Sequence, residues 1–435
     1  MTEQTAELIA RYFASSNGEL CISGMSVSSI VARHGTPLFI YDGSVIERKL
    51  SLLKQTLPPR WSIYYSVKAN PSREVLKFFV GREHGLEIAS AGEFQRAIDA
   101  GCAPRNVLFA GPGKREAELE AVLQQGIGEI HAESIAEIDR LSEISGRLGV
   151  KANVAVRVNP TAEAQGGAML MGGKPAPFGI DEENLDEAVA RILTRPRLHF
   201  RGIHLFTGTQ ILDCAALVRQ YRKALEIARR LAGRLGRPLD TVDFGGGLGV
   251  RYFVGERELD MNRLRTALAE LMSDIEGDPL FTGTRFIVEP GRYLVAEAGV
   301  YVARVNDVKV SRGKKFVILD GGMNHHLAAS GNLGQVIKRN FPLAVVNKLK
   351  QKPSEVVDVV GPLCTPLDVL GREVELPPVA IGDLVGIFQS GAYARSASPL
   401  GFLSHPAPEE VFVDNMEPPD SPARNVGHFR VSRAE

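Results

Sequence analysis

The chain carries the sequence SIYYSVKAN at residues 62–70, a short aliphatic and aromatic run that ends in a lysine. Such a run is typical of a buried β-strand. Burial disfavours a charged amine, so Lys68 needs either a partner or a lowered pKa. A neutral amine in a fixed position is what Schiff-base chemistry with an aldehyde requires. On this stretch alone, a structural lysine whose amine reaches solvent is an equally good interpretation.

Seven similar runs follow, and amphipathic stretches separate most of them. The clearest helical pattern covers residues 213–235, with Asp213 as its expected N-cap and Gly236 as its expected stop. Eight strands that alternate with helices favour an α/β fold, a closed parallel (β/α)8 TIM barrel rather than an open sheet. The expected strands are Ile63–Val67, Leu86–Ala89, Val107–Ala110, Glu129–His131, Asn153–Val158, Phe200–Phe206, Thr241–Phe244 and Arg285–Val288.

The pattern changes after Gly291, where short β runs separated by turns predict a mostly antiparallel β domain. A further strand at 37–42 is expected to join it. We therefore expect an N-terminal segment (1–45) that joins the β domain, a barrel (46–292), and a β domain (293–435) whose Pro-rich end, 406–435, is loosely held. The expected strands after the barrel are Val300–Val310, Phe316–Leu319, Val356–Val360, Val379–Ile381 and Leu384–Gln389.

Composition excludes several classes of function. The 435 residues include 51 basic and 51 acidic side chains, a balance that argues against a nucleic-acid or membrane surface. No apolar run is long enough to span a bilayer, and the first residues lack a signal-peptide core. The four cysteines are scattered, which argues against a zinc site or a disulfide framework and for the reducing cytoplasm. No metal is expected at His325-His326, since neighbouring strand residues point to opposite faces.

Several chemically distinctive segments follow the expected barrel strands directly. Active-site residues of such barrels lie at the carboxyl ends of the strands, so these segments are expected to share one rim. The segments are Lys68, Glu87–Ser90, Arg157–Asn159, Thr207–Gln210, Gly245–Gly247 and Glu289–Arg292.

The glycine loop Asp243–Gly249 allows backbone N–H groups to approach a phosphate closely, although a plain tight turn would look the same. Arg292, after the next strand, has a planar guanidinium suited to the same phosphate. Glu289 would be repelled by a phosphate unless it had a cationic partner. A protonated pyridine nitrogen is such a partner, and the alternative is a surface glutamate in a turn.

Two residues of the β domain are also candidates. Cys364 lies in the loop Gly361–Asp368; a lone cysteine is more often a small buried apolar residue, but its Gly and Pro neighbours favour a functional loop. Tyr393 ends another β run, where it is either a phenol at the site or a half-buried strand residue.

Five segments in this order resemble the fold-type III, pyridoxal-phosphate-dependent amino-acid decarboxylases, the group of diaminopimelate, ornithine and arginine decarboxylases. The resemblance covers about residues 28–403. It is closest to exosortase-associated decarboxylases and to those that act on an amino acid held by an acyl-carrier protein. The segments are Tyr64–Asn70, Gly202–Gln210, Asp243–Gly247, Glu289–Arg292, and Gly361–Asp368 followed by Gly391–Tyr393.

The resemblance implies roles for these residues. Lys68 would form the Schiff base with pyridoxal 5'-phosphate, and Glu289 would pair with the pyridinium nitrogen. Cys364 would protonate the carbanion after CO2 leaves, reaching the site from the other subunit of a homodimer in a loop that also carries Asp368. The residues implied around the phosphate are Gly245, Gly246, Gly247, Gly291, Arg292 and Tyr393, with His204, Phe206 and Thr209 near the cofactor.

Two positions depart from the family pattern. Phe206 stands where the family has a histidine over the cofactor ring; it can stack on the ring but cannot transfer a proton. Thr365 replaces the acidic residue that pairs with the distal amine of a diamino acid. A neutral hydroxyl does not offset the desolvation of an ammonium group, so we expect diaminopimelate, ornithine and lysine to be poor substrates. The Gly- and Met-rich stretch 165–173 is either a mobile cover for a bulky substrate or a surface loop.

We therefore expect a decarboxylase that acts on an amino acid or a carrier-linked aminoacyl group. A racemase on the same barrel is the alternative, against which the Cys364 loop argues because racemases of this fold use a tyrosine acid. A catalytically silent relative that binds partners is a third reading, and the intact Lys68, Glu289 and Cys364 argue against it.

Overall fold

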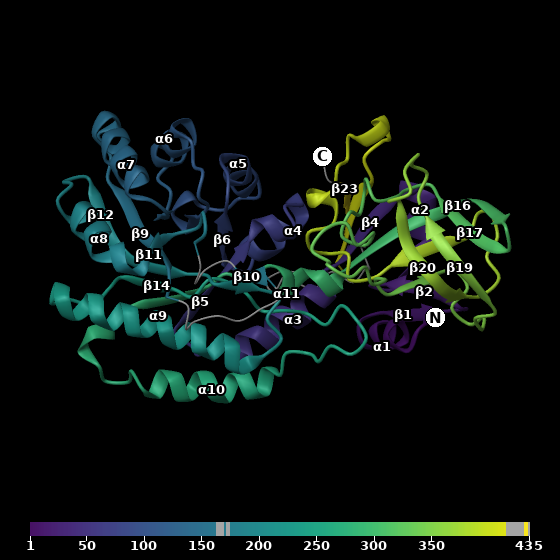
Figure 1. Ribbon diagram of the computed structural model, residues 1–435, viewed down its shortest axis with the longest axis horizontal. Helices are drawn as coiled ribbons and strands as arrows, with labels where there is room; N and C mark the ends of the chain where they lie inside the picture. The colour runs from purple at the N-terminus through teal and green to yellow at the C-terminus, as the bar shows by residue number, and fades with distance from the viewer. Residues whose placement is uncertain (162–168, 171–174, 415–429, 434–435) are drawn as a thin grey trace, which may run out of the picture. The chain divides into compact units, whose positions relative to one another are not determined.

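The computed structural model describes residues 1–161, 169–170, 175–414 and 430–433, which form two compact units (Figure 1). The barrel unit consists of Leu50–Val250 and Arg257–Tyr293. The sheet unit consists of Met1–Lys49, Arg251–Glu256 and Leu294–Glu435. No helix of the described residues is long and apolar enough to cross a membrane.

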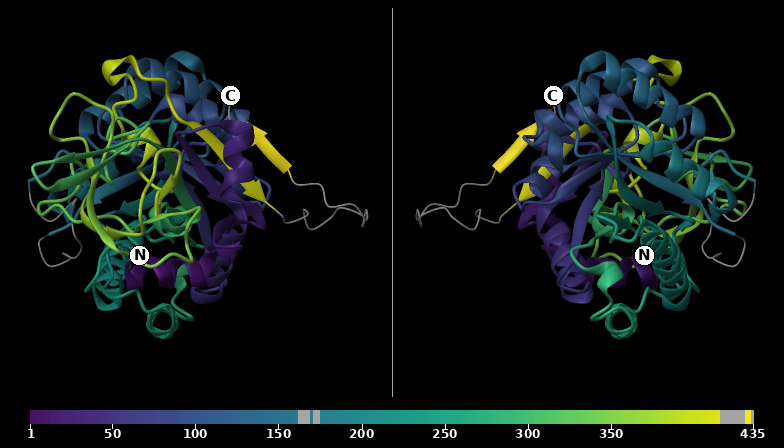
Figure 2. Two further views of the ribbon diagram at one scale, coloured as in Figure 1. Left: turned by 90° about the vertical axis from the view of Figure 1, so that its right-hand side faces the viewer. Right: turned by 90° about the vertical axis from the view of Figure 1, so that its left-hand side faces the viewer.

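The barrel unit contains a closed ring of parallel strands in the order β9-β12-β14-β15-β5-β6-β7-β8, and pairing of β8 with β9 closes the ring. This confirms the (β/α)8 TIM barrel, and all eight expected strands are present. In the right-hand view of Figure 2, helices surround the strands. The strands are β5 (Trp61–Ser66), β6 (Gly85–Ile88), β7 (Val107–Phe109), β8 (Glu129–Ala132), β9 (Ala152–Asn159), β12 (Leu198–Leu205), β14 (Thr241–Asp243) and β15 (Arg285–Val288).

The helices between the strands have the expected local signals. In α9 (Cys214–Leu235) the side chain of Asp213 accepts a hydrogen bond from the Ala215 N–H, and Gly236 ends the helix at φ +65°. A left-handed terminal residue is unstrained only when it lacks a Cβ. The other helices between the barrel strands are α4 (Arg73–Val80), α5 (Ala91–Asp99), α6 (Glu116–Gln124), α7 (Ile135–Leu148), α8 (Leu185–Leu193) and α10 (Met261–Ser273), and α3 (Gly43–Thr56) precedes β5.

The sheet unit is built on a mixed, mostly antiparallel sheet. The strand predicted at 37–42 is β4 (Leu38–Asp42), and it joins this sheet as expected, antiparallel to β16 (Gly299–Ser311). The other strands of the sheet are β17 (Lys314–Leu319), β18 (Leu343–Val345), β19 (Glu355–Val360), β20 (Val369–Leu376), β21 (Leu384–Ile387), β22 (Glu409–Asp414) and β23 (Arg430–Arg433). The unit also contains α1 (Glu3–Tyr12), α2 (Val27–His34) and a small sheet of β1 (Ala14–Ser16), β2 (Glu19–Ile22) and β3 (Met25–Ser26).

Two predictions for this unit were wrong. Residues 379–381 do not form a strand. They follow Pro377-Pro378, which have no N–H groups to donate to a neighbouring strand. The Asp383 N–H donates to the Ala380 carbonyl, so the segment forms a turn. The segment after 406 is not all loosely held, because β22 pairs in parallel with β4 and its Val411 and Val413 side chains are buried. The Pro-rich surroundings of this short apolar run, Val411–Val413, made it hard to recognise as a strand.

Gly202 allows two barrel strands to approach each other closely. It lies at a register shift between β12 and β9, and a Cβ built on it would overlap the backbone carbonyl oxygen of Thr241 on β14. Since that neighbour is backbone in a closed barrel, it has little freedom to move aside.

We therefore predict that Gly202→Ala lowers the free energy of unfolding by about 1–3 kcal/mol. Gly146→Ala is the matched control, because Gly146 is exposed near the end of α7 and a Cβ there would meet no atom within 4 Å. The control should stabilise the protein by about 0.5–1 kcal/mol. Urea unfolding midpoints measure both, and equal midpoints for the two variants would contradict the prediction.

Candidate active site

The residues predicted for the barrel lie at the carboxyl ends of its strands. Lys68 is in a 3-10 turn (Val67–Ala69) directly after β5, His204 is near the end of β12, and Glu289 follows β15. In a parallel barrel these ends open on one rim. The rim thus brings together the lysine, a histidine and the carboxylate that the sequence singled out.

Lys68 has a buried partner, Glu87, which the sequence placed on the same rim without predicting their contact. Its Nζ lies 2.6 Å from Oε2 of Glu87 on β6, whose side chain is 1% exposed, whereas that of Lys68 is 38% exposed. The Ser66 hydroxyl donates to the same carboxylate oxygen. The amine is therefore fixed on one side by a carboxylate and remains accessible on the other. The one acidic residue in the otherwise apolar strand Gly85–Ile88 is the sequence feature that could have indicated this partner.

Glu289 is a buried carboxylate next to two histidines. His204 Nε2 lies 3.3 Å from its Oε2, and His131 Nδ1 lies 4.0 Å from its Oε1. Burial alone would raise the pKa of Glu289, but the neighbouring His204, His131 and Lys68 outweigh it and hold that pKa below its ordinary value. The donor atoms of the three side chains lie within 4.8 Å of one another. An ionised carboxylate in this setting can hold a cation, either a metal ion or a protonated ring nitrogen.

Asp243, at the end of β14, is the neutral counterpart of Glu289. It is fully buried; its Oδ1 accepts a hydrogen bond of 2.8 Å from the Gly245 N–H, and its Oδ2 has no hydrogen-bond partner among the described residues. Burial raises the pKa of Asp243 well above its ordinary value, and the charge of Glu289 raises it further. Two adjacent carboxylates thus take different protonation states, and Glu289 carries the charge.

His131, on β8, connects the charged cluster to a second buried acid. Its Nε2 lies 3.2 Å from Oε1 of Glu129, and its ring centroid lies 4.4 Å from that of His204. Burial opposes ionisation of Glu129, yet the hydrogen bond from His131 brings the pKa of that carboxyl below its ordinary value. Neither residue was predicted for the site, because both were expected only as parts of the strand Glu129–His131.

The glycine loop has the form that a phosphate cradle needs. Gly245 and Gly247 adopt positive φ angles of +66° and +102°, and a Cβ on Gly246 would lie 2.5 Å from the carbonyl oxygen of Glu289. Within the described part of the chain, the amides of Gly246 and Gly247 have no hydrogen-bond acceptor. Unpaired N–H groups in a loop without side chains suit an anion.

Gly291 brings the Glu289 segment against the turn of Lys68. A Cβ on Gly291 would lie 2.8 Å from Cβ of Ala69 and 3.0 Å from Cβ of Ser66. The Ser66 N–H also donates to the carbonyl of Pro290 at 3.2 Å. The close approach of these two segments explains why the lysine and the carboxylate share one site. Arg292, partly exposed, opens the short helix α11 (Arg292–Val295).

Phe206 borders the glycine loop with a partly exposed ring. Its Cβ lies 2.9 Å from the position a Gly245 Cβ would take, and Cζ of Arg157 lies 5.8 Å from its ring centroid. Arg157 is held in turn by Glu133 at 2.8 Å. A supported ring with a free face can stack on a planar group. Thr209 lies in β13 (Gly208–Thr209), paired with β10 (Met169–Leu170); the rest of the stretch 165–173 lies outside the described residues.

The remaining predicted residues belong to the sheet unit. Cys364 is exposed there, and Asp368 shapes its loop by accepting hydrogen bonds from the Met323 N–H at 2.6 Å and the Leu363 N–H at 2.9 Å. Thr365 follows Cys364 in the same loop and is partly exposed. Tyr393 is also partly exposed, with a φ of +52°. The loop with the thiol is therefore held by its own carboxylate.

His325 and His326 use their ring nitrogens for structure. His325 pairs with the Tyr301 hydroxyl at 3.1 Å and with the Pro406 carbonyl at 3.0 Å. His326 pairs with the Ser390 hydroxyl at 2.9 Å and accepts from the Ala329 N–H at 3.2 Å. All four nitrogens are engaged in hydrogen bonds.

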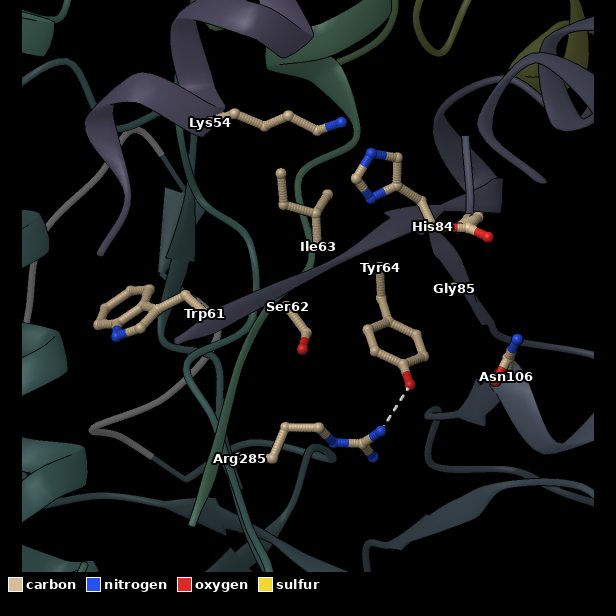
Figure 3. A pocket seen from close by; sticks show the side chains of 10 residues that line it. Lys54, Trp61, Ser62, Ile63, Tyr64, His84, Gly85, Asn106 and Arg285 are labelled. Carbon is tan, nitrogen blue, oxygen red and sulfur yellow. Dashed lines mark hydrogen bonds between the residues drawn. The ribbon is translucent and has the colours of Figure 1, made fainter. Parts of the chain in front are cut away.

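A polar hollow of about 320 Å³ lies at the amino ends of β5, β6 and β15, away from the Lys68 rim (Figure 3). In it, Arg285 donates a hydrogen bond of 3.0 Å to the Tyr64 hydroxyl. This contact ties the last barrel strand to the first. Residues at this end of such barrels generally serve stability, so the rim with Lys68 remains the candidate active site.

Comparisons with known proteins agree with the geometry of the rim. Residues 43–296 match the model of a family described as "Pyridoxal-dependent decarboxylase, pyridoxal binding domain". The chain is 38% identical over 392 residues to the L-glutamyl-[BtrI acyl-carrier protein] decarboxylase of Niallia circulans, covering 89% of this chain and 91% of the relative. It is 33% identical over 407 residues to the diaminopimelate decarboxylase of Zymomonas mobilis, covering 92% and 93%.

The fold is also found in solved structures. A crystal structure of diaminopimelate decarboxylase from Helicobacter pylori, complexed with L-lysine, superposes with a TM-score of 0.79 and 29% identity, covering 94% of this chain and 96% of that one. The likeness extends over both units of the chain, so the similarity is not confined to a common barrel.

The partly buried carboxyl of Glu93 gives a pH-dependent prediction. Burial raises its pKa from the ordinary 4.5 to about 7, and the Ala89 N–H donates to it at 2.7 Å. The folded protein thus holds this proton more tightly than the unfolded chain. The stabilisation of the folded state by the protonated Glu93 is complete below pH 4.5 and is lost as the pH rises through about 7.

Glu93→Gln keeps a hydrogen-bond acceptor for the Ala89 N–H but carries no charge. We expect its free energy of unfolding to equal that of the wild type at pH 4.5 and to be about 2 kcal/mol higher at pH 8. Urea unfolding at both pH values measures this difference. Glu143→Gln, an exposed residue of α7, is the control and should show no such change with pH. A Glu93→Gln effect of equal size at both pH values would rule out the assignment.

Proposed function

We propose, from the premise that this chain belongs to the pyridoxal-dependent decarboxylases, that it decarboxylates an amino acid held on a carrier protein, with pyridoxal 5'-phosphate bound at Lys68. The thioester to the carrier is formed by the side-chain carboxyl of the amino acid, which leaves the α-carboxylate free to depart as CO2. The cofactor and the amino-acid decarboxylase class follow from the family. The observation that carries the proposed residue roles is the meeting of Lys68, Glu289 and the glycine loop at one rim.

The rim residues fit the cofactor part by part. The accessible amine of Lys68 suits its aldehyde, and the unpaired amides of Gly246 and Gly247, with Arg292, suit its phosphate. The unpaired Oε1 of Glu289 suits its ring nitrogen. When bound, the cofactor supplies an electron sink for the bond to the departing carboxylate.

Glu289 keeps a positive charge on the ring nitrogen, in this proposal, because the protein holds the carboxylate ionised while buried. His204 and His131 stabilise that charge, and Asp243 stays neutral so that it does not compete for the same cation. Phe206 stands where the family has a histidine over the cofactor ring. Its partly exposed side chain would stack on that ring. His204 then acts by positioning Glu289.

Cys364 is the proposed proton donor to the α-carbon after CO2 has left. Its thiol is exposed, and Asp368 fixes its loop by two backbone hydrogen bonds. We infer that the loop serves the rim of a second subunit, so that the active form is a homodimer with shared sites. All four cysteines are free thiols, which supports a reducing compartment such as the cytoplasm.

The substrate is proposed to be held by a carrier protein rather than free. The 38% identical relative acts on L-glutamate attached to an acyl-carrier protein. At the position after Cys364, Thr365 offers no negative charge to the distal ammonium of a free diamino acid, and a buried ammonium without a partner is costly. Racemisation is the alternative chemistry, and the family match favours loss of CO2.

A CO2-release assay of the purified enzyme tests this proposal. L-Glutamyl-[BtrI acyl-carrier protein] should be turned over with a kcat/KM about 100-fold or more above those of diaminopimelate, ornithine and lysine, because the site lacks a partner for their distal amine. Chiral analysis of each amino acid is the control for racemisation. Strong CO2 release from any free diamino acid, or loss of chirality without CO2, would refute the proposal.

A further inference from the structure

Two histidines beside Glu289 have ring nitrogens that the proposed reaction does not use. His131 Nδ1 and both ring nitrogens of His204 lack a hydrogen-bond partner among the described residues, as does Oε1 of Glu289. All three side chains are buried. A protonated ring nitrogen of the cofactor would pair with Glu289 and leave the nitrogens of both histidines as they are. Because buried polar atoms without a partner are costly, these histidines indicate a further ligand.

The three side chains converge on one point inside the barrel. His204 Nε2 lies 3.3 Å from Oε2 of Glu289 without the alignment of a hydrogen bond, and His131 Nδ1 lies 4.0 Å from Oε1. One ligand atom from each side chain lies within 4.8 Å of the other two. Around a tetrahedral metal ion with bonds of about 2.0–2.1 Å, ligand atoms lie about 3.3 Å apart. The observed spacing is therefore close to that of a metal site.

Glu129 holds the ring of His131 in the orientation that a metal ligand needs. Its Oε1 lies 3.2 Å from His131 Nε2, and the Thr241 hydroxyl donates to the same carboxylate at 3.1 Å. An ionised carboxylate can only accept a hydrogen bond, so Nε2 carries the proton and the lone pair remains on Nδ1. Metal-binding histidines generally donate their second N–H to a carboxylate or carbonyl in this way.

Two imidazole nitrogens and one carboxylate select a class of metal ion. This donor set occurs in zinc sites that keep their fourth position for water. Imidazole ligands favour zinc and the neighbouring transition metals, whereas Mg2+ and Ca2+ prefer oxygen ligands. Glu289 and His204 lie at the carboxyl ends of their strands, so the site faces the same rim as Lys68.

We propose that His131, His204 and Glu289 form a binding site for a divalent metal ion of the zinc type in the protein without its cofactor. What this implies for the cofactor rests on the proposed function, in which the cationic ring nitrogen needs the same carboxylate of Glu289. Two cations at one carboxylate repel each other, so the metal ion and the cofactor exclude each other. The cofactor-free chain is thus sensitive to such metals, and the loaded enzyme is not.

Metal titration of the full-length protein, freed of cofactor, tests the site directly. Co2+ is the probe, because its visible absorption intensifies in tetrahedral coordination, and Zn2+ should displace it. Wild type should bind one ion tightly. His131→Asn and His204→Asn should each lower the affinity about 100-fold or more, and Glu129→Gln about tenfold. His199→Asn removes an exposed histidine of β12, the strand of His204, and is the matched control that should bind as wild type does.

Three results of this titration would overturn the site. They are a Co2+ spectrum without tetrahedral character, equal affinity in wild type and in both ligand variants, and displacement of Co2+ by Mg2+ at similar concentration. A buried water molecule would then be the ligand of the unpaired atoms. Because His131 and His204 are substituted separately, a folding defect in one variant leaves the other as the test.

A second measurement follows the visible absorbance band of the lysine-bound cofactor. Zn2+ added first should prevent the band in wild type and in His199→Asn, and a chelator should restore it. In His131→Asn the band should not respond to Zn2+, which excludes capture of the cofactor by the metal in solution. Tetrahedral Co2+ binding in a wild type that never develops the band would support the metal site and count against the proposed function. Binding of metal and cofactor together would overturn the exclusion.

Discussion

A buried negative charge at Glu289 is the constraint around which the candidate site is arranged. A carboxylate taken out of water is stable only beside positive or polarised partners. His204, His131 and Lys68 provide these partners. Burial raises the pKa of Asp243, and the adjacent charge of Glu289 raises it further, so Asp243 stays protonated. Gly246 and Gly291 lack side chains where the Glu289 segment packs against its neighbours. Glu289 therefore stays ionised while buried, and its Oε1 has no hydrogen-bond partner among the described residues.

The sequence predicts the barrel and its rim because both rest on local signals. Strand-like runs and helix caps such as Asp213 and Gly236 are short-range patterns, and the carboxyl ends of parallel strands must share one end. The family resemblance, which rests on motifs in a fixed order, added the cofactor and the expected roles of Lys68 and Glu289.

The rest of the site depends on contacts between distant strands. Glu87 was expected on the rim, whereas Glu129 and His131 were expected only as parts of a strand. Closure of the barrel is what brings these side chains to Lys68 and Glu289. In the sheet unit, β22 was missed because its pairing with β4 joins segments about 370 residues apart. Pairing between such distant segments produces no local sequence pattern that would distinguish β22 from its Pro-rich neighbours.

The two departures from the family pattern have different consequences. Phe206 borders the glycine loop with a ring that has no proton to transfer, and His204 lies beside Glu289 instead. Thr365 leaves the position after Cys364 without the acidic residue that the family pattern has there.

The central claim is that the accessible amine of Lys68, fixed by Glu87, binds pyridoxal 5'-phosphate covalently. The most direct measurement is the visible absorbance spectrum of the purified protein after incubation with the cofactor, for wild type, Lys68→Ala and the exposed control Lys151→Ala. The account predicts an absorbance band of the lysine-bound cofactor in wild type and control, and none in folded Lys68→Ala. A wild type without the band, or a Lys68→Ala variant that keeps it, would contradict the account.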